Sequence, residues 1–447
     1  MGTMKPELPP GTPSQLNRRP PIAASGIPGL MAGRRSVPLS VPLPFLLTGA
    51  CAAALFGLLL PAMMPDAMLA PDFPPVLALV HLATLGWLTM TIMGASLQLI
   101  PVITVSPLRA TRFLGFQYPV YGSGVLVLLC GFWWMQPWLM AAGGSLVVLA
   151  VVHYTVILAA SLLQAATRPL TVSFLAASVL SLCVVVSLGL TMALNLQFGF
   201  LGAAMQQVLL IHLILGILGW LSNTLIGVSY TLVRMFALAH GQSDRLGRRI
   251  FVFLNASIVV LAPGFIFTQS PLIMIGGAGL LAATWLFAYD FLRMMQARRR
   301  RVLDVTQYHS IAAVVYFSLL VPAGIAAAFF GWQQPGVLAA LGLAALVGWL
   351  GQSAVGYLYK IVPFLVWQSR YGPFVGRRKV PLMRELVHER WAWASWGLIN
   401  VGLAGALFSV LFAWLLAAQL ASGVLGAGLA LAAVNVVGVV RHLQKQG

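Results

Sequence analysis

The sequence predicts an all-α protein that crosses a membrane many times. Three observations indicate this class. Of 447 residues, 60% are hydrophobic and only 8% are charged, the mean hydropathy is +0.93, and long apolar runs recur along the chain. A water-soluble protein does not carry so large an apolar fraction. Because the runs are continuously apolar and do not alternate every second residue, they predict helices and exclude a transmembrane barrel.

Each of twelve apolar runs is long enough to cross about 30 Å of hydrocarbon as a helix. The predicted spans are residues 41–64, 75–104, 116–135, 138–166, 170–194, 203–235, 249–268, 271–295, 308–331, 335–366, 392–416 and 419–440. They form one membrane domain over residues 41–440. Residues 1–40 are rich in Pro, Ser and Gly, which predicts a disordered cytoplasmic tail and not a signal peptide. Residues 441–447 are predicted to form a second cytoplasmic tail.

The basic residues indicate how the chain is oriented. The formal net charge is +18, yet Lys and Arg occur only on alternate loops, and the first loop between them holds Asp66 and Asp72. By the positive-inside rule, both termini are cytoplasmic. We therefore expect a multi-pass protein of a bacterial inner membrane that contacts anionic lipid and binds no nucleic acid. The three cysteines lie singly on three spans, without the spacing of a haem-attachment or paired metal site.

A short motif recurs three times. Gly86-Trp87-Leu88 is matched by Gly219-Trp220-Leu221 and Gly348-Trp349-Leu350, and a further glycine follows each tryptophan by seven residues. That spacing places tryptophan and glycine on one helix face, where a neighbouring helix can approach closely. The copies lie on the second, sixth and tenth spans, so they predict three four-helix units, residues 41–166, 170–295 and 308–440. A tight helix contact is sufficient to explain the motif itself.

Three histidines lie well inside predicted spans: His81, His153 and His212. An imidazole inside a membrane helix is costly unless it ligates a metal, finds a hydrogen-bond partner or faces water. All three are candidates for a haem or metal site, and ordinary hydrogen bonding inside the bundle is the alternative. His81 and His212 lie in the outer halves of helices that three packed units would bring together around one cofactor or cavity. His309, at the start of the ninth span, is expected at the surface.

Other polar residues predict a second kind of site. Asn223 on the sixth span and Gln352 and Lys360 on the tenth are candidates for a polar pathway through the bundle. Lys360 lies near the inner end, where we expect it to snorkel to the surface. Arg234 and Asp290 end their helices at one depth, which predicts an ion pair at the inner surface. Since no carboxylate is expected inside the bundle, we infer no proton pump.

The second span resembles a known family. His81, Trp87, the pair Gly94-Ala95 and the ending Leu99-Ile100-Pro101, together with twelve helices and cytoplasmic termini, resemble the large subunit of the heme-copper oxidase superfamily. The nitric-oxide-reductase branch is the nearest in these residues. The resemblance implies that His81 ligates haem b and that His212 lies on the helix that supplies a copper ligand.

The chain departs from that family at other ligands. The seventh span, FVFLNASIVVLAPGFIF, lacks the family's histidine pair, and the tenth, VLAALGLAALVGWLGQSAVGYLY, lacks its His-x-His. His212 precedes its motif by two more residues than His81 does, which turns it by about 200° around the helix. The buried glutamates of the nitric-oxide-reducing branch are also missing. A copper centre and reduction of oxygen or nitric oxide are therefore not expected.

The leading functional hypothesis is a diverged relative of this subunit. It would bind haem b or a metal near His81 and His212 in a redox, gas-sensing or respiratory accessory role, with an electron-transfer or respiratory-complex partner. Two alternatives stay open: a cofactor-free transporter or channel for a small solute, and a structural subunit of a membrane complex.

Overall fold

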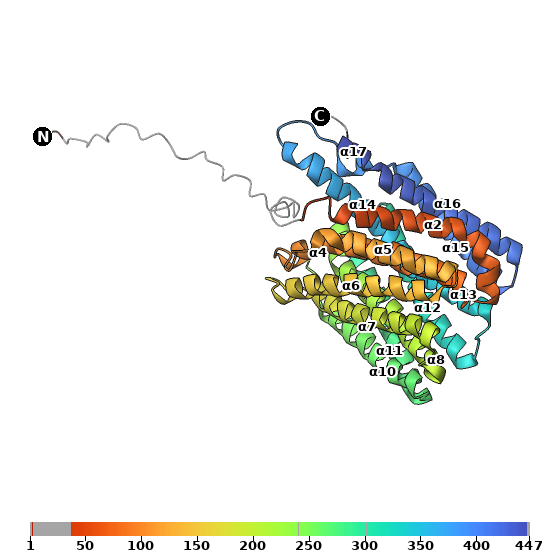
Figure 1. Ribbon diagram of the computed structural model, residues 1–447. Helices are drawn as coiled ribbons and strands as arrows, with labels where there is room; N and C mark the ends of the chain where they lie inside the picture. The colour runs from red at the N-terminus through yellow and green to blue at the C-terminus, as the bar shows by residue number, and fades with distance from the viewer. Residues whose placement is uncertain (1, 3–36, 240, 301, 445–447) are drawn as a thin grey trace.

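The computed structural model describes residues 2, 37–239, 241–300 and 302–444. Over these residues the chain folds into helices without a strand, and twelve helices are long and apolar enough to cross a membrane. The predicted fold class of a polytopic, all-α membrane protein is therefore confirmed. The helices run side by side in one bundle, and α2 begins at the same end of it where α17 ends the described chain (Figure 1). Apart from Gly2 and residues 37–40, the predicted N-terminal tail lies outside the described residues.

The twelve spans are taken in chain order as three groups of four. The first group contains α2 (Pro42–Leu69), α3 (Pro74–His81) continuing through η1 (Leu82–Thr89) into α4 (Met90–Thr104), α5 (Leu114–Trp133) and α6 (Pro137–Leu163). The second contains α7 (Leu170–Phe198), the run η2 (Gly202–Ala204), α8 (Met205–Ile214), η3 (Leu215–Ser222) and α9 (Asn223–Ala237), then α10 (Arg245–Ile266) and α11 (Ser270–Gln296).

The third group has the same order. It contains α12 (Val305–Phe330), the run α13 (Pro335–Leu343), η4 (Ala344–Gly351) and α14 (Gln352–Arg370), then α15 (Glu389–Leu411) and α16 (Leu415–Gly438). Two short 3-10 turns, η5 (Gly372–Phe374) and η6 (Met383–Leu386), lie in the loop before α15, and α17 (Arg441–Gln444) follows α16.

Several helices extend beyond the predicted spans. α10 begins at Arg245 instead of residue 249, α15 at Glu389 instead of 392, and α2 ends at Leu69 instead of 64. An apolar run marks only the part of a helix that lies in hydrocarbon, whereas the backbone hydrogen bonds continue into the interface, where charged side chains remain hydrated. For the same reason part of the predicted C-terminal tail, Arg441–Gln444, forms a helical turn.

Each helix that carries the repeated motif changes its winding at the same place. η1, η3 and η4 are π-helical segments of eight residues, and each runs from five residues before the motif tryptophan to two residues after it. π-Helical segments are rare and short and often occur at functional sites. Their wider turn shifts the side chains that follow by about one residue, or roughly 100° around the helix. Helical periodicity in the sequence does not reveal this shift.

The three groups close into a ring. The last helix of each group packs against the first helix of the next: α6 against α7, α11 against α12, and α16 against α2. The closing contact is tight because two glycines meet there, and a Cβ added to Gly57 of α2 would lie 2.7 Å from Cα of Gly426 of α16. Close approach of this kind is how membrane helices gain packing energy without a hydrophobic driving force.

Each of the three motif tryptophans reaches the motif segment of a neighbouring helix. Trp220 Nε1 donates to Thr89 Oγ1 at 3.0 Å, and Trp349 Nε1 donates to Ser222 Oγ at 2.9 Å. Both acceptors lie two residues after the neighbouring tryptophan. The corresponding third position is Gly351, and Trp87 Nε1 is buried without a hydrogen-bond partner among the described residues. We call Trp87, Trp220 and Trp349 the tryptophan triad. The division into three units stays a prediction, and this cyclic contact agrees with it.

Candidate functional site

His81 and His212 lie next to each other in the structure. His81 is the last residue of α3 and immediately precedes the π-helical segment η1. His212 lies near the end of α8, three residues before the π-helical segment η3. Their ring centres are 6.4 Å apart with an angle of 36° between the ring planes. Both side chains are half-buried. The packing of the second and sixth spans thus brings together the two histidines that the sequence had placed in different units.

Hydrogen bonds to the backbone fix the two rings. His81 Nδ1 donates to the carbonyl of Leu77 at 2.8 Å, and His212 Nδ1 donates to the carbonyl of Val185 at 3.0 Å. Because a carbonyl oxygen only accepts, Nδ1 carries the hydrogen in both rings and Nε2 carries the lone pair. No described residue forms a hydrogen bond with either Nε2. Metal-ligating histidines are oriented in this way, with the second ring nitrogen bonded to a carbonyl or carboxylate.

The surroundings of the histidine pair are apolar and close. The ring of His81 stacks on Phe132 of α5, with ring centres 4.7 Å apart. The ring of His212 lies over Gly189 of α7, where an added Cβ would be 3.2 Å from Cε1 of the histidine. Within the described residues no group of three His, Cys, Asp or Glu side chains is arranged to hold a metal. The pair therefore offers two imidazoles and no third protein ligand of these types.

The two histidines lie at different distances along the chain from the tryptophans of their motifs. His81 precedes its tryptophan by six residues and His212 precedes its own by eight, so they project from nearly opposite sides of their helices. In a cyclic arrangement, one side of a helix contacts the opposite side of the next helix. The offset of two residues, which turns the imidazoles away from equivalent faces, therefore brings the two rings to the same contact, with ring centres 6.4 Å apart.

The separation of the rings distinguishes between kinds of metal site. A metal–nitrogen bond of about 2 Å places a metal about 3 Å from the ring centre, so two histidines on opposite sides of one metal have ring centres about 6 Å apart. At a tetrahedral angle the same bonds bring the centres to about 5 Å. The observed 6.4 Å lies close to the longer of these two separations. Imidazole nitrogens are ligands that both haem iron and metal ions accept.

His153 lies in a different environment. Its Nδ1 is 2.6 Å from Gln117 Oε1 of α5, and Gln117 Nε2 donates to the carbonyl of Ala150. The ring also meets the edge of Phe113, and no described contact joins it to His81 or His212. Nδ1 of His153 is thus bonded within the α5–α6 pair, while its Nε2 is buried without a hydrogen-bond partner among the described residues. The structure does not bring His153 to the histidine pair.

The three residues of the predicted polar pathway all have partners. Asn223 and Asn255 of α10 exchange amide hydrogen bonds of 3.1 Å, and Gln352 Nε2 donates to Asn400 Oδ1 of α15 at 2.9 Å. Asn223 and Gln352 each lie three residues after a motif tryptophan, so their side chains take corresponding places in the second and third groups. In the first group this place is occupied by Met90, which faces Gly122 of α5.

Lys360 is paired at the end of the bundle. Its ammonium group bonds to the carboxylate of Asp304, which also accepts from Arg300 at 3.1 Å, and its side chain is only 13% exposed. Asp304 caps the N-terminus of α12, accepting from the amide of Thr306. The ammonium group thus extends toward the helix end, the direction in which a snorkelling lysine extends, and a counter-charge on the neighbouring helix holds it there.

Three predictions at this end of the bundle are wrong. Arg234 pairs with Asp244 at 2.7 Å, while Asp290 is 2% exposed, accepts from the hydroxyl of Tyr230 at 3.0 Å and pairs with Arg293 at 3.7 Å. These contacts replace the expected Arg234–Asp290 pair, and a carboxylate does lie inside the bundle. His309, expected at the surface, is fully buried and bonds to Gln352. Helix contacts that the sequence does not specify cover both residues.

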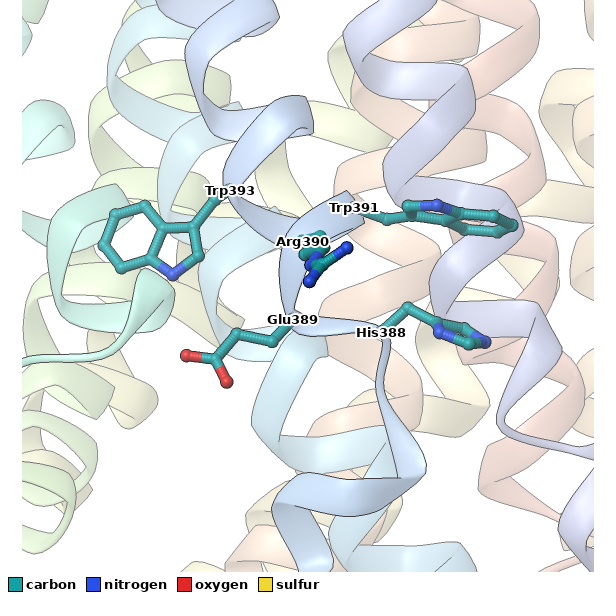
Figure 2. A pocket seen from close by; sticks show the side chains of 5 residues that line it. All are labelled: His388, Glu389, Arg390, Trp391 and Trp393. Atoms are coloured by element: carbon teal, nitrogen blue, oxygen red, sulfur yellow. The ribbon is translucent and has the colours of Figure 1, made fainter.

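A cavity of about 590 Å³ lies at the start of α15 and is lined by His388, Glu389, Arg390, Trp391 and Trp393. Consecutive residues of one helix end point in different directions around it (Figure 2). Trp393 and Trp391 extend to opposite sides, and the carboxylate of Glu389 points away from His388 (Figure 2). Since the side chains do not converge on one point, this cavity is not a ligand or metal site. Its tryptophans are typical of the membrane–water interface.

No protein-family model matches this chain, and no curated protein sequence matches it significantly.

Proposed function

We propose that this protein is a redox or gas-sensing membrane protein that holds haem b between His81 and His212. The observation that supports it is the pair of half-buried imidazoles whose ring centres are 6.4 Å apart. Both present a bare Nε2 because both Nδ1 atoms are bonded to backbone carbonyls. The proposal keeps the diverged relationship to the heme-copper oxidase large subunit that the second span suggested, with both termini cytoplasmic and an electron-transfer or respiratory partner.

The residues of the site would perform separate tasks. His81 and His212 would supply the two nitrogen ligands, and the carbonyls of Leu77 and Val185 would hold their tautomers. Phe132 would prevent rotation of the His81 ring by stacking on it. When bound, a haem with two histidine ligands supplies one-electron chemistry and has no open position for oxygen. The absence of the family's other histidines agrees with a role without oxygen reduction.

The test is the visible absorption spectrum of the detergent-purified protein, expressed with haem supplied. We expect a Soret band and, after reduction with dithionite, the sharp bands of a six-coordinate haem. His81→Ala and His212→Ala should each lose most of the bound haem or convert it to a five-coordinate form. His153→Ala should keep the wild-type spectrum, because the described contacts of His153 are with Gln117 and Phe113 and not with the histidine pair.

A wild-type protein without a chromophore, although haem was supplied, would refute this proposal. Titration of that apoprotein with Zn²⁺ and Cu²⁺ then distinguishes a metal-ion site from a protein without a cofactor. Stoichiometric binding that is lost in His81→Ala would leave a metal-ion site at the histidine pair. No binding would favour the transporter or the structural subunit, and the amide pairs Asn223–Asn255 and Gln352–Asn400 would be the first residues to substitute in a flux assay.

A further inference from the structure

A second buried histidine lies in the third group, apart from the proposed haem site. His309 of α12 packs against Gly356 of α14, where an added Cβ would be 2.7 Å from Cβ of the histidine. Gly94 and Gly227, the corresponding glycines of the other two copies, pack in the same way against Phe45 of α2 and Phe174 of α7. A histidine thus occupies a place that two of the three groups fill with phenylalanine. Packing alone does not require an imidazole there.

A chain of amide hydrogen bonds determines which nitrogen of His309 carries the hydrogen. Asn400 Nδ2 donates to the carbonyl of Trp396 at 2.8 Å, so Asn400 Oδ1 is the atom that accepts from Gln352 Nε2. Gln352 therefore presents Oε1 to His309, at 2.5 Å from Nδ1, and Nδ1 must donate. This leaves a lone pair on Nε2, which is buried without a partner among the described residues. The hydroxyl of Thr306, one turn earlier on the same helix, is buried without a partner as well.

Charged residues lie between His309 and the end of the bundle that carries the basic loops. Asp304 caps the helix on which His309 lies, and Lys360, four residues after Gly356, bonds to it. Tyr359 stacks beside the imidazole, with ring centres 6.0 Å apart. From α15 only neutral groups face this region, Asn400 and Ser395. The titratable groups of α14 on this side are Tyr357, Tyr359 and Lys360. The helices α9 and α11, which also pack against α12, carry a separate charged cluster around the Asp290 carboxylate, made up of Tyr230, Arg234 and Arg293.

We propose that His309 is a buried proton-binding site, reached from the basic end of the bundle past the Asp304–Lys360 ion pair. A proton from the aqueous phase forms an N–H bond at Nε2, and the neutral ring becomes an imidazolium. The oxygen of Gln352 then stabilises the positive ring through Nδ1, because charge strengthens that hydrogen bond. The hydroxyl of Thr306 lies on the same side of α12 and provides a polar contact for the incoming proton.

The test uses the full-length protein in detergent with its histidine side chains labelled with ¹⁵N. His309→Phe identifies the signal of His309 by the loss of one of seven histidine signals. We expect this variant to fold, since Phe45 and Phe174 occupy the corresponding places. The double variant His309→Phe/Gln352→Met also replaces the amide by methionine, as in the first group, where Met90 lies at this position. It provides a second folded reference if the single variant is unstable.

On lowering the pH, the assigned Nε2 signal is expected to change reversibly from that of a bare nitrogen to that of an N–H. A His309 signal that stays neutral at every pH at which the protein remains folded would overturn the proposal. Lys360→Met should slow protonation after a pH jump by tenfold or more. Equal rates in wild type and Lys360→Met would exclude the ion pair from the route. The double variant His81→Ala/His212→Ala should leave the titration of His309 unchanged, so this test does not depend on haem binding.

Discussion

Gly351→Ala is expected to destabilise the protein by about 1–3 kcal/mol, because it overpacks the centre of the bundle. Gly351 is the last residue of η4, and the ring of Trp87 rests directly on it. An added Cβ would lie 2.5 Å from Cη2 of Trp87 and 2.8 Å from the carbonyl oxygen of Leu346. Trp87 is fully buried and cannot move aside without disturbing the tryptophan triad. Thermal unfolding in detergent, followed by circular dichroism, measures the effect.

Gly342→Ala is the matched control for this substitution. Gly342 lies on the same span, in α13, and an added Cβ there meets no atom within 4 Å. Its unfolding temperature should therefore equal that of the wild type or rise slightly, since alanine favours a helix. Trp87→Phe/Gly351→Ala should be more stable than the sum of its single effects predicts, because phenylalanine lacks the atoms that the new Cβ would meet. If Gly351→Ala and Gly342→Ala were equally stable, the ring of Trp87 would have to be able to move away from the added Cβ.

Asp304→Asn is expected to destabilise the protein by about 2 kcal/mol, less than the 3–5 kcal/mol typical of a fully buried pair. The side chains of Asp304 and Lys360 are 23% and 13% exposed, so water screens part of their interaction. Asparagine caps a helix as well as aspartate does. The substitution therefore removes the charge that faces Lys360 and leaves the cap of α12 in place. Chemical denaturation in mixed micelles is the suitable measurement.

Asp72→Asn provides the reference for this experiment, because Asp72 is exposed in the first loop at the other end of the bundle. It should not change stability by more than about 0.5 kcal/mol. Asp304→Asn/Lys360→Met should regain part of the loss, since the double variant leaves no unpaired ammonium group inside the bundle. A double variant less stable than Asp304→Asn alone would mean that Lys360 stabilises the bundle through its aliphatic chain and not through its charge.

The histidines show where prediction from the sequence ends. His81 and His212 were identified from their chemistry, since an imidazole within an apolar helix requires a partner. Their common site depends on how the second and sixth spans pack, which the sequence motif indicates only indirectly. His309 was misplaced because a residue at the start of a span is ordinarily exposed. The signal that would have found it is its position: it is the fifth residue of α12, as Phe174 is of α7.

The π-helical segments were also beyond prediction. Helical faces were assigned with 3.6 residues per turn, and η1, η3 and η4 depart from that winding just where the motif lies. The hydroxyls of Thr89 and Ser222 were therefore not expected to meet the tryptophans of neighbouring helices, as they do at 3.0 and 2.9 Å. The departure from regular winding and the cyclic contact occur together at the three copies.

The sequence by itself determined the membrane-spanning class, the twelve spans and the three places where the motif recurs. These follow from local properties, because transfer of about 20 apolar residues into hydrocarbon is favourable whatever the rest of the chain does. Only the tertiary structure decided which polar groups meet: His81 with His212, Gln352 with His309, and Lys360 with Asp304. The residues in such contacts lie on separate helices, 43 to 131 positions apart in the sequence. Their contacts therefore depend on the order, rotation and winding of the helices, which no local pattern in the sequence records.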